Sequence, residues 1–71
     1  MTKLNYNNTE INVLNIPYTN HTLIIAPYMG MELSFIFNGR IADQINDNED
    51  LKKMVYTRIK NEYRFNRILT A

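Results

Sequence analysis

The chain contains no cysteine, one histidine, one serine and two glycines. Without cysteine it has no disulfide, no thiol nucleophile and no cysteine-ligated zinc site. His21 alone cannot supply a histidine cage for a metal ion. Gly30 and Gly39 stand where turns are expected and do not form a phosphate-binding loop. The sequence therefore predicts no cofactor and no metal.

Catalytic motifs are also missing. A Ser–His–Asp set would have to come from Ser34, His21 and Asp43, but Ser34 lies in no Gly-x-Ser-x-Gly elbow. Four acids cluster further on: Asp43, Asp47, Glu49 and Asp50. Their spacing differs from a calcium-binding loop and suits the start of a helix, where acids interact favourably with the positive end. We predict no catalytic residues and no enzymatic activity.

No run of about 18 apolar residues is present, and the N-terminus lacks the apolar block of a secretion signal. We therefore expect a cytoplasmic protein that does not contact a membrane. At 71 residues and 8.4 kDa the chain forms at most one domain, and its core is thin. Small domains without disulfides often gain stability from a partner or a second copy, so a homodimer is one expectation.

Residue types with AT-rich codons are abundant: Asn, Ile, Lys, Tyr and Phe supply 32 of the 71 residues. This composition indicates a low-GC genome. A short, cysteine-free chain of this kind is typical of bacteriophage or mobile-element proteins, in which case the location would be the host cytoplasm.

Three β-like segments precede a C-terminal helix. Residues 1–9 are polar and expected to be flexible, and residues 10–71 to form a single α+β domain. Residues 10–16 and 21–26 are strand-like runs, each followed by a proline, and residues 31–37 alternate apolar with polar positions. The predicted fold is a three- to four-stranded antiparallel meander with one amphipathic helix packed on one face of the sheet.

The Asn38-Gly39 pair predicts a hairpin turn, because both residues tolerate positive φ. The returning strand would be residues 40–45, joined through a bulge that places Ile41 and Ile45 on the core face. A short helical segment over 41–45 is the alternative, since Ile41 and Ile45 are also one helical turn apart.

No proline or glycine interrupts residues 47–71, which are predicted to be helical, with Asn46 or Asp47 as N-cap. Arg58 and Glu62 lie toward the apolar side of this helix and are spaced to pair, or their aliphatic stems could instead cover apolar surface. Four cations fall together on the side of this helix away from its apolar residues: Lys53, Lys60, Arg64 and Arg67. They indicate either a solvated face that complements the helix dipole or a phosphate-binding stripe.

One helix covers only one face of a sheet, and residues 23–25 direct apolar groups to both faces. The second face, bearing Ile24 or Leu23 with Ile36, therefore needs a cover. The loops add large side chains that are typical of interfaces, Tyr18, Tyr28, Met29 and Met31, although these rings could instead fold back over the core. The predicted function is a non-enzymatic protein that binds and inhibits or modulates another protein. The alternative is a small nucleic-acid-binding regulator that uses the helical stripe.

Overall fold

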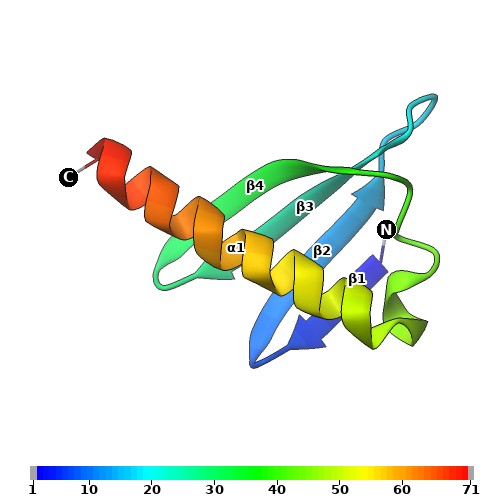
Figure 1. The fold of residues 1–71 in the computed structure, drawn as a ribbon, viewed down its shortest axis with the longest axis horizontal. Coiled ribbons are helices and arrows are strands. Elements are labelled where there is room, and N and C mark those ends of the chain that lie inside the picture. The colour runs from blue at the N-terminus through cyan, green and yellow to red at the C-terminus, as the bar shows by residue number, and fades with distance from the viewer. Residues whose placement is uncertain (1, 71) are drawn as a thin grey trace.

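A computed structural model describes residues 2–70 of the chain, and the side chains of residues 2–68. Four strands come first, β1 (Thr2–Tyr6), β2 (Thr9–Asn15), β3 (His21–Tyr28) and β4 (Met31–Asn38). A 3₁₀ turn, η1 (Ile45–Asp47), leads into the helix α1 (Glu49–Thr70). The helix lies diagonally across one face of the sheet (Figure 1). The predicted α+β arrangement, an antiparallel sheet followed by one C-terminal helix, is confirmed.

The sheet has the order β1-β2-β3-β4, with every neighbouring pair antiparallel. Two-residue turns close the first and the last hairpin, Asn7-Asn8 and Met29-Gly30, and all four turn residues have positive φ. Two consecutive positive φ angles are the signature of the type I′ turn, whose twist matches that of the flanking strands. These turns fix the register, so that Leu4 lies opposite Ile11.

The prediction of a flexible segment over residues 1–9 is corrected for the residues that the structure describes; Met1 lies outside them. Thr2–Tyr6 form β1, which pairs with β2 along its whole length. Leu4 is buried in the core, and the polar pair Asn7-Asn8 forms a tight turn. The segment is polar because β1 is an edge strand whose alternate residues face solvent, not because it lacks structure.

The predicted returning strand at residues 40–45 is wrong, and the helical alternative is closer. Gly39, at φ +96°, donates its N–H to the carbonyl of Asn20 at 2.8 Å, so the chain leaves β4 instead of reversing beside it. Residues 42–44 form a turn that leads into η1. The amide of Ile45 donates to the carbonyl of Ile41 at 3.0 Å, and both side chains are buried.

Two polar side chains hold this connecting segment against the end of the sheet. The Thr22 hydroxyl, fully buried, donates to the Gly39 carbonyl at 2.6 Å and accepts the Ile41 N–H at 3.0 Å. Asn15 Oδ1 lies 3.0 Å from the same hydroxyl and accepts the Ala42 N–H at 3.1 Å. Side-chain partners thus replace the ladder that a fifth strand would have provided.

Helix α1 begins later than predicted. Asn48 is its N-cap, because its side-chain oxygen accepts the Leu51 N–H at 3.0 Å. Asn46 and Asp47 lie in η1 instead and do not cap the helix. The predicted pair within the helix is confirmed, with Arg58 Nε 3.3 Å from Glu62 Oε2.

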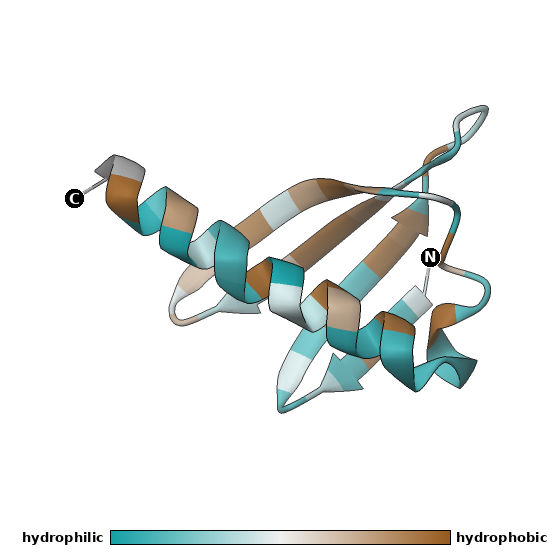
Figure 2. Ribbon diagram, viewed as in Figure 1, coloured by the Kyte–Doolittle hydropathy of each residue, from teal (hydrophilic) through white to brown (hydrophobic). Residues whose placement is uncertain are grey.

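The core lies between α1 and the sheet face beneath it, which we call the inner face. Figure 2 shows the apolar residues concentrated on the strands, whereas α1 is largely hydrophilic. The helix contributes Val55 and Ile59, both without solvent exposure, to this layer. The strands contribute alternate side chains, namely Leu4, Ile11, Val13, Ile24, Ala26, Leu33 and Phe35.

One turn residue is poorly matched to its backbone. Met29 is exposed and has φ +51°, a conformation that costs an ordinary L-residue about 1 kcal/mol. We expect Met29→Asn to raise the free energy of unfolding by about 1 kcal/mol, measured by urea titration, because asparagine tolerates this conformation. Asn7 occupies the corresponding position of the β1–β2 turn at φ +50°. Asn7→Met should therefore lower stability by a similar amount, and equal effects of the same sign would contradict this account.

Candidate protein-interaction surface

The sheet face opposite α1, which we call the outer face, has no covering layer among residues 2–70. Leu14, Leu23 and Ile36 lie directly opposite one another on three adjacent strands of this face. Ile25 stands in the next row on β3. We call these four residues the outer strip. Ile36 is 53% exposed and the other three are half-buried, although each is aliphatic.

On β3 and β4, the rows of side chains on either side of Leu23 and Ile36 contain no lysine, arginine or acidic residue. His21 and Asn38 form the row on one side, and Asn12 and Ser34 flank Ile25 on the other. The charged residues of this face, Lys3, Glu10 and Glu32, lie further toward the β1 edge or the tight turns. A contiguous aliphatic surface with a polar border is the usual composition of a protein-binding patch.

Of the two residues predicted to anchor the open face, Ile36 lies there and Ile24 does not. Ile24 is fully buried beneath α1, opposite Phe35. The residue on the outer face is its neighbour Leu23, which was the other possibility. The tight turn at Met29-Gly30 decides between them, since a shift of one residue in register would exchange the two faces of the strand.

Tyr18 and Met29 extend into solvent, at 106% and 71% exposure. They lie in loops at opposite ends of β3, so they do not form one patch. Tyr18 has φ +62°, and Arg40 holds its loop by donating to the carbonyls of Ile16 at 2.9 Å and Thr19 at 2.7 Å. The exposed Tyr18 ring thus stands on a loop that side-chain hydrogen bonds hold in place at the β2–β3 end of the sheet.

Tyr28 and Met31 face the inner side and are half-buried against the core. The Tyr28 ring packs edge-on against Tyr63, with centroids 5.3 Å apart, and against Tyr56 at 6.0 Å. Tyr6 completes this cluster 5.4 Å from Tyr56. The pKa of Tyr28 is raised above its ordinary value. Desolvation is the largest cause, and a hydrogen bond with Tyr56 is the second. Tyr28 therefore fixes the helix to the sheet, and the predicted role for its ring at an interface is corrected.

Sequence reasoning missed this tyrosine cluster, although the spacing of Tyr56 and Tyr63 carried a signal. Residues seven apart lie on the same side of a helix, so the spacing predicts that the two rings face in the same direction. Their partners on the strands, Tyr6 and Tyr28, each flank a tight turn. The turns place both rings at the same end of the sheet, beneath the middle of α1.

The helical stripe is exposed as predicted, at Lys53, Lys60, Arg64 and Arg67. Two of these cations also have contacts within the chain. Lys60 Nζ lies 5.4 Å from the Tyr56 ring centroid, and the Arg67 guanidinium lies 5.9 Å from that of Tyr63. Cation–π contacts of this kind stabilise the tyrosine cluster, so part of the stripe has a structural role.

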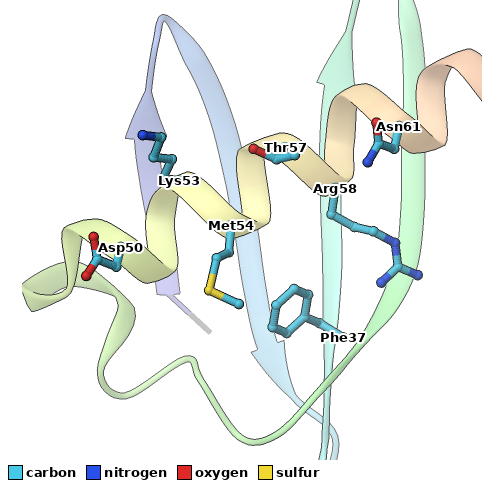
Figure 3. A pocket seen from close by; sticks show the side chains of 7 residues that line it. All are labelled: Phe37, Asp50, Lys53, Met54, Thr57, Arg58 and Asn61. Carbon is cyan, nitrogen blue, oxygen red and sulfur yellow. The ribbon is translucent and has the colours of Figure 1, made fainter.

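A groove of about 530 Å³ runs between α1 and β4 (Figure 3). Phe37 and Met54 approach one another across its floor, and Met54 is 57% exposed. Five further residues line the groove from the helix, Asp50, Lys53, Thr57, Arg58 and Asn61. The groove arises because the diagonal helix does not cover the C-terminal half of β4.

The groups considered for catalysis are not assembled into a site. His21 lies opposite Asn38 and Ser34 opposite Ile25, four positions apart along the strands, and Asp43 Oδ2 accepts the Asn15 amide at 3.3 Å. Within residues 2–70, no group of three or more histidine or acidic side chains is arranged to bind a metal ion. In the same part of the chain, none of the helices combines the length and the hydrophobicity of a membrane span.

Comparisons with protein-family models, with curated proteins and with solved structures find no match to this chain.

Proposed function

We propose that this chain is a non-enzymatic interaction protein that binds another protein through the outer strip and modulates it by covering part of its surface. The observation that carries the proposal is the open outer face, on which three aliphatic residues align across β2, β3 and β4 and are not covered by any other part of residues 2–70. The AT-rich composition supports an origin in a bacteriophage or mobile element.

The chemistry of the strip favours a protein surface as its occupant. Leu23 and Ile36 stand side by side on a sheet face, a geometry that fits a broad apolar surface better than a small molecule, which needs a concave pocket. Phosphates are disfavoured here because the side chains that flank the strip on β2, β3 and β4, namely Asn12, His21, Ser34 and Asn38, include no lysine or arginine. The partner should therefore present aliphatic or aromatic side chains with an uncharged border.

The test introduces a charge into the strip at its most exposed member. Affinity capture from a host lysate, followed by mass spectrometry, first supplies candidate proteins, and each is then purified and titrated. We expect Ile36→Lys to weaken the partner's binding at least about tenfold, because the lysine ammonium would be buried against an apolar surface. Ile36 is 53% exposed, so the change should leave the fold intact.

The matched control is Asn5→Lys, which adds the same charge to the outer face on β1, away from the strip. It should bind the partner like the unmodified chain. Equal affinity of the Ile36→Lys variant and the unmodified chain for every purified candidate would overturn the proposal. Binding of a DNA or RNA oligonucleotide that survives Ile36→Lys, but is lost when Lys60, Arg64 and Arg67 become glutamine, would assign the function to the helical stripe instead.

A further inference from the structure

The two edges of the sheet differ in how well they are protected from pairing with another strand. The β1 edge is five residues long and carries Lys3, whose ammonium lies 3.9 Å from Glu10. The β4 edge is eight residues long, pairs with β3 without a bulge, and contains neither lysine nor proline. Short length and lysine are the usual protections of an edge strand, and β4 has neither.

The backbone of β4 is available for a further ladder. The sheet ends at β4 among the described residues. Tyr28 and Met31 flank a two-residue turn, so in this hairpin the odd-numbered residues of β4 bond to β3. The amide and carbonyl groups of Ser34 and Ile36 consequently point to the open edge. The apolar groove at Phe37 and Met54 opens beside this edge, on the inner side.

We propose that the β4 edge pairs with β4 of a second copy, antiparallel, to give one eight-stranded sheet. Centred on Phe35, this pairing sets Leu33 of one copy opposite Phe37 of the other, and Ser34 opposite Ile36. Glu32, the charged residue of β4, then faces Asn38. The strand is thus complementary to itself, since apolar residues meet on the inner face and no like charges are opposed.

The arrangement also enlarges the candidate binding surface. Ile36 of each copy lies at the new junction on the outer face, with Leu23 and Leu14 in line behind it. Each Ile36 then lies opposite Ser34 of the other copy, so the two outer strips meet diagonally across the junction. The dimer depends on the β4 edge, whereas the proposed function depends on the open face, so either can fail without the other.

The size of the contact sets the expected strength. Seven paired residues span about 23 Å at about 3.3 Å per residue. The shortest extent of the molecule is 17 Å. The contact then covers about 400 Å² of each copy, compared with about 800 Å² for a typical stable interface. We therefore expect a dimer that dissociates on dilution.

The experiment is light scattering on the purified chain from about 10 μM to about 1 mM. The mass should rise from 8.4 kDa toward twice that value. Ser34→Pro removes an N–H that points to the β4 edge and should keep the chain monomeric throughout. Asn5→Pro removes the corresponding N–H at the β1 edge and should dimerise like the unmodified chain. Circular dichroism establishes that both variants are folded.

Hydrogen exchange on the unmodified chain gives a second measurement that needs no variant. The amides of Ser34 and Ile36 should exchange at least about fivefold more slowly at 1 mM than at 10 μM, while those of Lys3 and Asn5 stay unchanged. A mass of 8.4 kDa at every concentration would overturn the dimer. So would a dimer with unchanged exchange at Ser34, because the contact would then lie elsewhere. Binding titrations run below 10 μM test the outer strip on the monomer, separately from this outcome.

Discussion

Ile59→Ala should lower the free energy of unfolding by about 2 to 5 kcal/mol, the usual cost of truncating a fully buried isoleucine. Ile59 has no solvent exposure and belongs to the core cluster between α1 and the sheet. A domain of this size has about 4 to 10 kcal/mol of stability in all. We therefore expect a variant close to unfolding at 25 °C, measured by urea titration with circular dichroism.

The control for this prediction is Ile68→Ala, the same truncation in the same helix. Ile68 is 75% exposed, so little apolar surface returns to water when it is shortened. The helix propensity of alanine should make this change neutral or slightly stabilising. If the two variants lose equal stability, α1 is not held to the sheet by the core seen here.

Thr22→Val should lower the free energy of unfolding by about 2 to 3 kcal/mol. Valine has the same shape as threonine but cannot donate to the Gly39 carbonyl or accept the Ile41 N–H. Both backbone groups would then lose their side-chain partner at a fully buried position, and each unsatisfied group costs about 1 to 3 kcal/mol. The measurement is again a urea titration.

Thr57→Val is the matched control for the loss of the hydroxyl, because Thr57 is exposed on α1. Its effect should stay within about 0.5 kcal/mol, as for most surface substitutions. In the Thr22→Val variant, the amide of Ile41 should also exchange faster with solvent than in the unmodified chain. A stable variant with unchanged exchange would mean that the connecting segment does not depend on the threonine.

Several features followed from local pattern alone. The alternation over residues 31–37 predicted β4 with Leu33 and Phe35 on one face, and both are buried. The uninterrupted C-terminal stretch predicted one amphipathic helix, and the four-residue spacing predicted the Arg58–Glu62 pair. Such features depend on contacts within a few residues, so the sequence specifies them directly.

The errors came from segments whose structure depends on distant partners. The Asn38-Gly39 pair has the composition of a hairpin turn, yet the Gly39 amide bonds to Asn20, nineteen positions earlier. Tyr28 has the composition of an interface residue, yet its ring is held by Tyr56 and Tyr63 of the helix. In both cases a contact with residues far away in the sequence determined the structure, and the local composition did not.

Local patterns were sufficient to predict a small α+β domain with one helix, and to predict that one helix leaves one side of the sheet open. Periodicity, turn residues and chain length support these predictions, because all three can be read from the sequence without knowledge of distant contacts. Three further features are visible in the folded chain alone: Leu23 and not Ile24 faces outward, β1 and not residues 40–45 supplies the fourth strand, and β4 is an edge. Each of those depends on strand register and on long-range hydrogen bonds, which no local pattern encodes.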